Sequence, residues 1–394
     1  MHNPFGEMKQ NRCIGFDAEY MNIGSSELGS YGRYIVEALA MACEKTTYFR
    51  MYAPHQGSDV DYEALVALQN VESMSPDGRC WRKVPALWRM GRVSWDARCG
   101  NVELFHGLAN ELPFGLSRNN ILGIVTIHNL GFLRATSGNP IMRQIRRLRL
   151  KSACHRADRI MAISENTKRD IVEWLDIDPD KIDVVYHGCH ARFNEPVSAE
   201  RIAEVRERYR LPDNYLLYVG AHKSYKNIEL ALEALATLSE EVSLVVVGNH
   251  TPYTEELRDL IQSLGIEERV LMPSGVASED MPALYAGAEM LLCTSRHEGF
   301  SMPIIEAMSV GIPVIAVHGT CHEEAGGEAA IYVSPDDSEE LADNIKIVRM
   351  NDVLRHRMVA AGREQVSRFR PEVVAYNILN CYKRIGVDLT ELRR

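Results

Sequence analysis

Residues 298–314 read EGFSMPIIEAMSVGIPV, and this stretch decides how the chain is interpreted. Pro303 suits the first position of a helix, because its missing N–H would have no partner there. Gly311 then marks the end of that helix, since glycine readily adopts the left-handed conformation that terminates helices. We therefore expect Glu298 just before a helix and Glu306, eight positions later, in its first turn.

Such an element combines two kinds of binding group. The carboxylates of Glu298 and Glu306 accept hydrogen bonds from hydroxyl groups. A helix N-terminus offers unpaired N–H groups and a positive dipole end, which favour a phosphate, and Gly299 lets the backbone come close to a ligand. A molecule with several hydroxyls and a phosphate fits this description, and a nucleotide sugar is the obvious member of that class.

The composition describes a globular protein without an evident nucleic-acid partner. The 394 residues suggest two domains, and the apolar and charged fractions of 46% and 25% are ordinary. The net charge of −10 provides no general attraction for nucleic acid. The nine cysteines lack zinc-site spacing and are expected to be free thiols. We see neither a signal peptide nor a membrane span, which predicts a cytoplasmic protein.

The second half alternates apolar strands with amphipathic helices, a pattern typical of a parallel sheet covered on both faces. The expected strands are 215–219, 242–247, 269–272, 290–294, 314–317 and 330–333, with helices near 227–238 and 255–264.

The first half repeats the pattern less clearly. The expected strands are 13–16, 48–53, 102–105, 121–127, 159–163 and 182–186, while no element can be placed between 59 and 98. A polar stretch around Pro196 breaks the rhythm. We therefore predict Rossmann-like domains over 1–196 and 197–372, with a helix in 373–394 that returns to the first domain as one possibility.

Residues 298–314 resemble the defining motif of the retaining glycosyltransferases of family 4, which include bacterial mannosyl- and glucosyltransferases of surface glycans. All fixed positions of Glu-Gly-Phe-x-x-Pro-x-x-Glu-Ala-Met-x-x-Gly-x-Pro-Val are present. The resemblance implies the GT-B architecture, in which two doubly wound α/β domains face each other across a cleft. It also implies retention of configuration, independence of metal ions, no cofactor, and a nucleoside-diphosphate sugar as donor.

The resemblance assigns roles in the second domain. Glu298 would bind sugar hydroxyls together with the backbone at Gly299, Phe300 and Ser301, while Glu306 would hold the ribose. The segment 218–227 is similar to the family's glycine loop ending in Lys-Asn, which makes Gly220 and Lys226 diphosphate contacts. A fixed cation there stabilises the charge that grows on the leaving phosphate. The arginine that relatives carry in this loop is missing, and His222 or Lys223 would replace it.

Two segments of the first domain complete the expected site. Residues 24–34 look like the family's Gly-Gly-x-Gly-Arg-Tyr loop, so that Gly29 and Gly32 would let backbone approach the diphosphate. His128 resembles the family histidine that contacts the donor sugar. His106 ends another strand and is a weaker candidate for acceptor contact. Residues 319–327 resemble a family loop near the nucleotide, with no contact assigned.

A basic block interrupts an otherwise acidic chain between Arg143 and Arg159. It fits an anionic membrane at the inner face of the plasma membrane, or a phosphorylated lipid-linked acceptor. The other explanation is a solvated helix face. Its members are Arg143, Arg146, Arg147, Arg149, Lys151, Arg156 and Arg159.

The sequence thus predicts a retaining hexosyltransferase that uses a GDP- or UDP-sugar and a glycan or lipid-linked acceptor, as in surface polysaccharide or lipopolysaccharide synthesis. Mannose is slightly favoured over glucose, galactose or N-acetylglucosamine. A sugar-nucleotide epimerase of the same architecture and a non-catalytic nucleotide-sugar-binding subunit are the alternatives. A phosphorylase-like enzyme is a poorer one, since no lysine motif marks a pyridoxal phosphate site.

Overall fold

A computed structural model describes residues 12–22, 27–55, 57, 60–134 and 139–389. Their contacts divide the chain into two compact units, Met1–His187 with Pro371–Arg394 and Gly188–Arg370, here called unit 1 and unit 2. The predicted boundary at residue 196 therefore lies inside unit 2. One reason is that Phe193 packs edge-on against Tyr285, with ring centroids 5.7 Å apart.

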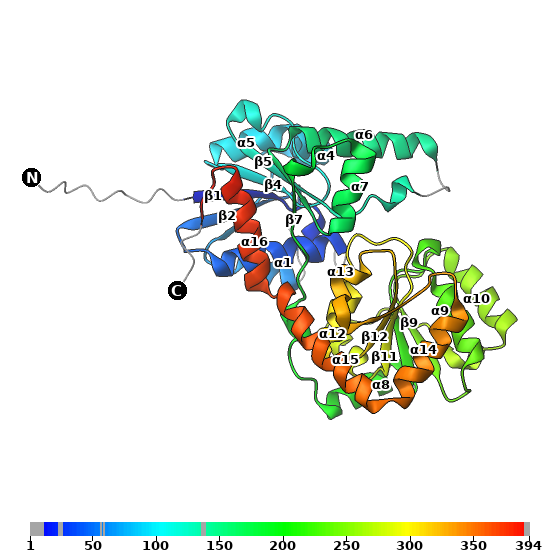
Figure 1. Cartoon of the computed structure of the whole chain (residues 1–394). Helices are drawn as coiled ribbons and strands as arrows, with labels where there is room; N and C mark the ends of the chain where they lie inside the picture. Colours follow the sequence, from blue (N-terminus) through cyan, green and yellow to red (C-terminus); the bar gives the residue numbers. More distant parts are fainter. Residues whose placement is uncertain (1–11, 23–26, 56, 58–59, 135–138, 390–394) are drawn as a thin grey trace, which may run out of the picture. The chain divides into compact units, whose positions relative to one another are not determined.

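Unit 1 is built on a seven-stranded parallel sheet with the order β3-β2-β1-β4-β5-β6-β7 (Figure 1). The strands are β1 (Arg12–Asp17), β2 (Thr47–Tyr52), β3 (Val71–Met74), β4 (Leu104–Gly107), β5 (Leu122–Ile127), β6 (Arg159–Ala162) and β7 (Ile182–Val184). The strands predicted from the sequence are all present, and β3 is the one that sequence reasoning missed.

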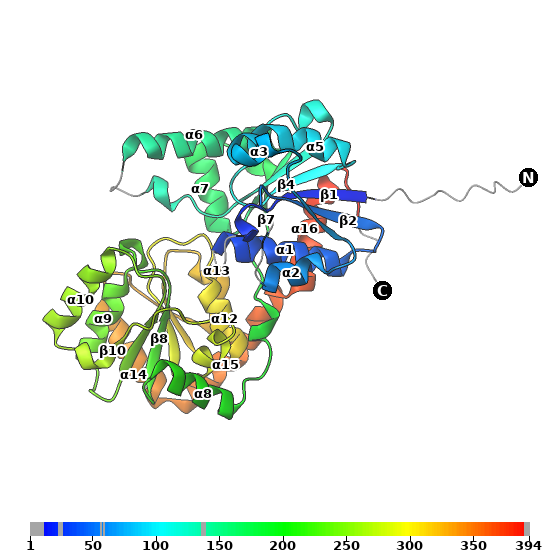
Figure 2. The same cartoon turned by 180° about the vertical axis from the view of Figure 1, so that it is seen from behind.

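Helices flank both faces of this sheet (Figure 2). They are α1 (Glu27–Ala42), α2 (Val60–Val66), α3 (Arg79–Lys83), α4 (Pro85–Leu87), the π-helical turn η2 (Trp88–Arg92), α5 (Val93–Cys99), α6 (Pro140–Arg156), α7 (Glu165–Leu175) and α16 (Pro371–Arg384). The last of these packs beside α1, so the C-terminal helix belongs to unit 1.

Unit 2 contains a six-stranded parallel sheet with the order β10-β9-β8-β11-β12-β13. The strands are β8 (Tyr215–Val219), β9 (Ser243–Val247), β10 (Val270–Leu271), β11 (Met290–Cys293), β12 (Val314–Val317) and β13 (Ile331–Val333). The predicted strands are confirmed within two residues at each end. Successive apolar residues of a strand point to opposite faces, which explains why these short runs are apolar throughout.

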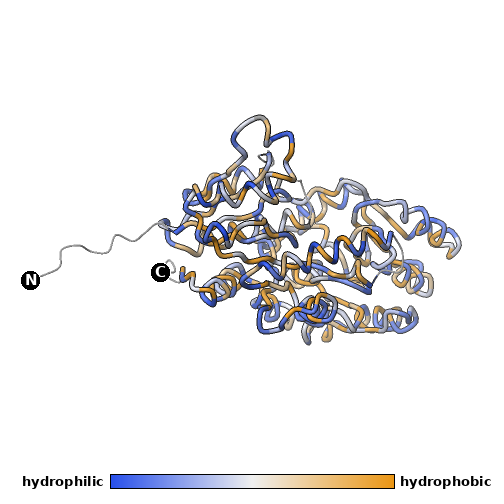
Figure 3. Tube along the Cα trace, turned by 90° about the horizontal axis from the view of Figure 1, so that it is seen from above, coloured by the Kyte–Doolittle hydropathy of each residue, from blue (hydrophilic) through white to orange (hydrophobic). Residues whose placement is uncertain are grey.

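The helices of unit 2 form two groups. Helices α9 (Ile228–Thr237), α10 (Tyr253–Leu264) and α14 (Ser338–Met350) share one apolar core with the sheet, which includes Leu216, Leu244 and Leu292. The second group packs together around α12 and comprises α8 (Ala199–Tyr209), α11 (Met281–Ala286), α12 (Met302–Val310), α13 (His322–Gly326) and α15 (Asp352–Gln365). Hydrophobic and hydrophilic residues alternate along the chain, as expected for elements that bury one side and expose the other (Figure 3).

The strand orders locate the ligand edge of each sheet. In a doubly wound sheet the crevice lies beyond the carboxyl ends of the strands, at the point where the strand order reverses. This switch point falls between β1 and β4 in unit 1 and between β8 and β11 in unit 2. All nine cysteines are free thiols, as expected.

Candidate active site

Residues 298–314 form part of the loop after β11, the helix α12 and the connection to β12. Helix α12 begins at Met302 with Pro303 as its second residue, and Gly311 ends it with a φ of 96°. The helix is thus confirmed, but Glu306 is its fifth residue and lies in the second turn. The prediction of a first-turn position was wrong, because the helix starts one residue earlier than Pro303.

Lys226 lies in the loop after β8. This loop and the loop after β11, which carries Glu298, lie on either side of the switch point of unit 2. The loop ends in a short 3-10 turn, η7 (Ser224–Lys226), and Asn227 follows with a φ of 53°. The side chain of Asn227 donates to the carbonyl of Pro335 at 2.9 Å. A Cβ on Gly248 would stand 1.9 Å from the carbonyl oxygen of Gly220, so only glycine lets these two loops pack.

The structure brings Lys226 and Glu298 together, as the sequence suggested for a shared site. The Lys226 Nζ atom lies 2.5 Å from Glu298 Oε1, and 13% and 10% of the two side chains are exposed. Backbone contacts fix the loops that carry them: Arg296 N–H donates to the Tyr225 carbonyl at 2.9 Å. Because each loop is anchored, the ion pair is held at the carboxyl edge of the sheet between β8 and β11.

Glu306 occupies a different environment within unit 2. Tyr285 donates its hydroxyl proton to Glu306 Oε2 at 2.7 Å. Burial raises the pKa of Glu306 to about 7, while Tyr285 and the positive charge of Arg192 act in the opposite direction. Near neutral pH this carboxyl group is therefore close to the midpoint of its titration.

The residues between the two glutamates connect them to the apolar core. The Phe300 ring contacts the Phe369 ring edge-on, with centroids 5.5 Å apart. Ser301 is buried and precedes α12, but its side chain makes no capping hydrogen bond to the helix. The Ser301 hydroxyl instead lies 3.9 Å from Cys293 Sγ. Phe300 thus anchors the segment that holds Glu298 and the N-terminus of α12.

His222 does not supply the second cation that its position suggested. Its ring is fully buried, Nδ1 lies 3.0 Å from the Thr254 hydroxyl, and the ring stacks on His250. Burial and the neighbouring His250 lower the pKa of His222 to about 4, so the ring is neutral at neutral pH. The other alternative named from the sequence, Lys223, is exposed.

Sequence reasoning did not single out His322, which begins α13 after β12. Its Nδ1 lies 3.0 Å from the Val317 carbonyl and must therefore carry the proton. Its Nε2 is buried without a hydrogen-bond partner among the described residues. Burial lowers the pKa of His322, and the opposing charges of Glu298 and Lys226 also act on it. His322 is thus a neutral acceptor near the ion pair, which only the folded structure reveals.

In unit 1, His128 follows β5 and is buried beside Tyr31, whose ring meets it edge-on at 4.5 Å. Its Nε2 lies 2.7 Å from the Leu108 carbonyl, so Nε2 donates and Nδ1 is left as an acceptor. Burial lowers the pKa of His128 to about 4. The ring can therefore accept a hydrogen bond from a hydroxyl but does not carry a positive charge at neutral pH.

The structure contradicts the acceptor role considered for His106. Its two ring nitrogens lie 2.8 Å from the hydroxyls of Tyr382 and Thr126, and the ring is completely buried. Burial lowers its pKa to about 3. The residue joins the sheet to α16, because Tyr382 belongs to that helix.

The sequence placed Gly29 and Gly32 in a segment that follows the first strand and opens a helix, and the structure confirms this helix as α1. Both lie inside α1, as its third and sixth residues, while residues 23–26 of the expected loop are outside the described residues. A Cβ on Gly32 would come within 2.8 Å of Met21 Cε. Gly32 therefore permits close packing of α1, and a diphosphate contact by either glycine stays a prediction.

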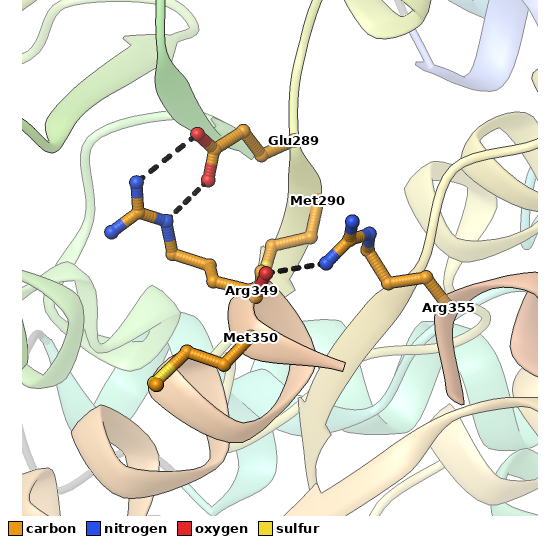
Figure 4. Close-up of a pocket in the computed structure, with 5 residues that line it drawn as sticks. All are labelled: Glu289, Met290, Arg349, Met350 and Arg355. Atoms are coloured by element: carbon orange, nitrogen blue, oxygen red, sulfur yellow. Dashed lines mark hydrogen bonds and ion pairs between the residues drawn. The ribbon is translucent and has the colours of Figure 1, made fainter. Parts of the chain in front are cut away.

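A separate pocket in unit 2 lies away from these groups. It is lined by Glu289, Met290, Arg349, Met350 and Arg355, at the opposite end of β11 from Glu298 (Figure 4). Arg349 Nε pairs with Glu289 at 2.6 Å, and Arg355 donates to the last carbonyls of α14. These contacts close the end of a helix, so the pocket is explained by the fold.

Two Rossmann-like units, one with a lysine–glutamate pair at its switch point, define a glycosyltransferase of the GT-B fold. The comparisons agree. Residues 31–192 match the model of "Glycosyltransferase Family 4", and residues 202–365 match that of "Glycosyl transferases group 1". The chain therefore belongs to the family 4 glycosyltransferases.

The chain is also similar to individual glycosyltransferases, and its fold is similar to that of a solved structure. The O-antigen chain mannosyltransferase B of Escherichia coli is 26% identical, with 94% of this chain and 99% of that protein covered. The D-inositol 3-phosphate glycosyltransferase of Corynebacterium diphtheriae is 23% identical, with 91% and 90% covered. The crystal structure of Anabaena HepE in complex with UDP has a TM-score of 0.72 at 17% identity, covering 95% and 100%.

Neither a metal cluster nor a membrane span is found in the part of the chain that the structure describes. There, no three or more His, Cys, Asp and Glu side chains gather as metal ligands would. None of the described helices combines the length and apolar character needed to cross a bilayer.

Proposed function

We propose that this glycosyltransferase moves mannose from a nucleoside-diphosphate donor to a hydroxyl of a glycan or lipid-linked acceptor, with retention and without a metal ion. The observation that carries the proposal is the Lys226–Glu298 ion pair at the switch point of unit 2. Mannose is favoured because a relative covered over 99% of its length is named an O-antigen chain mannosyltransferase. Anabaena HepE, of the same fold, has been crystallised with UDP-glucose, which supports a nucleotide sugar as donor.

The ion pair suits both halves of such a donor. In the absence of donor, Lys226 and Glu298 satisfy each other and are held in position by their loops. A bound diphosphate would take over the ammonium group of Lys226, which would stabilise the charge that grows as the sugar leaves. Glu298 would then accept hydrogen bonds from hydroxyls of the sugar, with the Gly299 and Phe300 amides nearby.

Other groups have chemistry that fits the donor. Glu306 would hold the ribose hydroxyls, since its carboxyl group accepts hydrogen bonds in either protonation state. His322 Nε2 is a neutral acceptor without a partner among the described residues, and His128 Nδ1 is the acceptor nitrogen of a neutral ring; each fits a sugar hydroxyl. The incoming acceptor hydroxyl would lose its proton to the leaving diphosphate itself, so no nucleophile of the enzyme is needed.

Thermal unfolding with GDP, UDP and ADP and their sugars tests the donor. A ligand at one hundred times its dissociation constant stabilises the folded state by about 2.7 kcal/mol. We expect GDP-mannose to give the largest shift, and a larger shift with a UDP-sugar would overturn the choice of mannose.

Product analysis tests the reaction. With an oligosaccharide acceptor, the NMR coupling of the new anomeric centre should show the configuration of the donor, and excess EDTA should leave the rate unchanged. An inverted product or loss of activity with EDTA contradicts the mechanism. Isomerisation of the donor without acceptor would instead favour the epimerase.

A further inference from the structure

The loop that follows β4, residues 108–116, begins at the switch point of unit 1. Two of its residues hold His128. The Leu108 carbonyl accepts from His128 Nε2 at 2.7 Å, and Asn110 Oδ1 accepts from the His128 backbone N–H at 2.8 Å. The start of the loop is tight, because a Cβ on Gly107 would stand 1.9 Å from the Glu111 carbonyl oxygen. The loop is therefore a fixed structure that extends away from His128.

The same loop carries Glu111 into a cluster of charged side chains. Arg89 of η2 forms ion pairs with Glu111 and with Glu19. Its Nε atom also lies 3.6 Å from Asp17 Oδ2. Asp17 ends β1, so the cluster gathers at the carboxyl ends of the two strands that flank the switch point. The guanidinium is nearly buried, whereas Glu19 and Glu111 keep 34% and 27% of their side chains exposed.

Farther along the loop, Phe114 presents a flat apolar surface to solvent. The Arg156 guanidinium covers one face of the ring, with its central carbon 4.0 Å from the ring centroid. Arg156 Nη2 donates to the Leu112 carbonyl at 2.6 Å, which fixes the guanidinium. Phe114 is nevertheless 51% exposed, so its other face is open. The Phe114 N–H donates to the Met90 carbonyl at 2.7 Å, which ties this ring to the turn that carries Arg89.

Exposed carboxylates and an open aromatic face on one loop fit a saccharide. Carboxylates accept hydrogen bonds from hydroxyl groups, and an arginine that pairs with them holds their geometry. The C–H face of a hexose ring is apolar and packs on the electron-rich face of an aromatic ring. Three carboxyl groups against one guanidinium leave an excess of negative charge, which repels a phosphate group. The cluster therefore favours a hydroxyl-rich molecule without negative charge.

We propose that Glu19, Glu111 and Phe114 bind the acceptor, and that the bound part of the acceptor is an uncharged saccharide. The sugar with the reacting hydroxyl would lie on the two carboxylates, and a neighbouring sugar of the same chain would stack on the open face of Phe114. Continuity of the loop with His128 selects this occupant. The inference rests on the proposed function, since it assigns the chemical class of the acceptor for that reaction.

NMR titration of the full chain with uncharged trisaccharides of mannose, glucose and galactose, with and without GDP or UDP, tests the site. We expect at least one of them to bind, and the same trisaccharide with a 6-phosphate to bind about tenfold more weakly. Phe114→Leu should weaken binding about tenfold, since it keeps an apolar side chain over Arg156 but removes the stacking face. Phe114→Tyr keeps the ring and should bind normally. Glu111→Gln should weaken binding and narrow the preference over the 6-phosphate.

Matched controls lie elsewhere in unit 1. Tyr376→Leu removes an aromatic ring of α16 that is 52% exposed. Glu103→Gln removes a carboxylate of 31% exposure that also pairs with an arginine, Arg12, and that precedes β4. Both variants should bind the trisaccharide like the unmodified chain, and melting curves show whether each variant is folded.

Three results would overturn the inference: no binding of any trisaccharide, tighter binding of the 6-phosphate, or unchanged binding by folded Phe114→Leu. Kinetics separate this failure from failure of the proposed function. Transfer to a saccharide with an unchanged acceptor KM in Phe114→Leu and Glu111→Gln would contradict the acceptor site alone. A saccharide that binds through Phe114 but receives no sugar from any donor would contradict the reaction and support the site.

Discussion

The carboxyl edges of the two sheets differ in how their polar side chains are used. In unit 1, His106 is saturated by hydrogen bonds from its own fold, and burial keeps both His106 and His128 neutral. In unit 2, Lys226 and Glu298 form an ion pair through their side-chain ends. A ligand can replace one partner of such a pair without leaving a buried group unsatisfied, because it brings charge and hydroxyls of its own.

This comparison suggests a division of labour. The Lys226–Glu298 ion pair at the switch point belongs to unit 2, while His128 of unit 1 offers a neutral acceptor of hydrogen bonds. Substitutions at Lys226 and Glu298 of unit 2 should therefore change donor binding and turnover, whereas removal of a hydrogen-bond partner of His106 in unit 1 should change stability. The following experiments are ordered from the largest expected effect to the smallest.

Lys226→Ala should lower turnover by at least tenfold. The ammonium group acts most strongly on the charge that develops on the leaving diphosphate, so kcat should fall more than the affinity for the donor. Steady-state kinetics on the purified variant measure both. Lys346→Ala is the control, since Lys346 makes only an exposed pair with Asp343 and should leave the rate within twofold. Near-normal turnover of Lys226→Ala would break the comparison.

Glu298→Gln should weaken donor binding by roughly tenfold, because a neutral amide accepts weaker hydrogen bonds from sugar hydroxyls than a carboxylate does. Calorimetric titration of the single variants and of the double variant with Lys226→Ala sharpens this expectation. The two losses should not add, since the residues are in direct contact. Strictly additive losses would mean that the two side chains act at separate places.

Glu306→Gln should change how stability depends on pH. The pKa of Glu306 in the folded chain is about 7, above its ordinary value of 4.5. Between these values the folded state holds a proton that the unfolded state has released, so stability falls as pH rises through this window. At pH 8 the unmodified chain should therefore have lost unfolding free energy on the order of 2–3 kcal/mol that Glu306→Gln does not lose. At pH 4.5 the titration of Glu306 should contribute little to the difference between the two proteins.

Urea unfolding of both proteins at the two pH values measures this difference. Comparison at each pH removes the contributions of other titrating groups, including Asp17, whose pKa burial raises to about 6. A stability difference that is the same at both values would show that Glu306 titrates normally.

Tyr382→Phe should cost about 1–2 kcal/mol of unfolding free energy, because it leaves the buried Nδ1 of His106 without a partner. Turnover should stay within twofold at a temperature where the variant is folded. Chemical unfolding and a standard assay measure the two effects. A large loss of turnover with unchanged stability would restore the acceptor role that the structure contradicts for His106.

Much of the fold was predictable because short apolar runs alternate with amphipathic helices. Strands such as β8 and β12 were found to the residue, since each is apolar throughout and is followed by a glycine or polar loop. The edge strand β3 was missed for the opposite reason. Of its four residues, Val71 alone is buried. The other three are partly exposed, and Glu72 and Ser73 among them are polar.

The candidate site could be proposed from the sequence only where residues matched a family motif. The sequence placed Lys226 and Glu298 in one site through the family resemblance, and the contact between the two side chains is a finding of the structure. A strand-end histidine carries no such information: His106 is buried in the core, and its partner Tyr382 is 276 positions away in the chain. His322 was hidden likewise, because its free Nε2 depends on burial and on the contact that occupies Nδ1.

A crystal structure with the nucleotide sugar that stabilises the chain most tests the central claim directly. The account predicts a diphosphate oxygen within hydrogen-bond distance of Lys226 Nζ, and a sugar hydroxyl on the carboxylate of Glu298. A bound donor that leaves Lys226 and Glu298 paired to each other, with its diphosphate elsewhere, would contradict it.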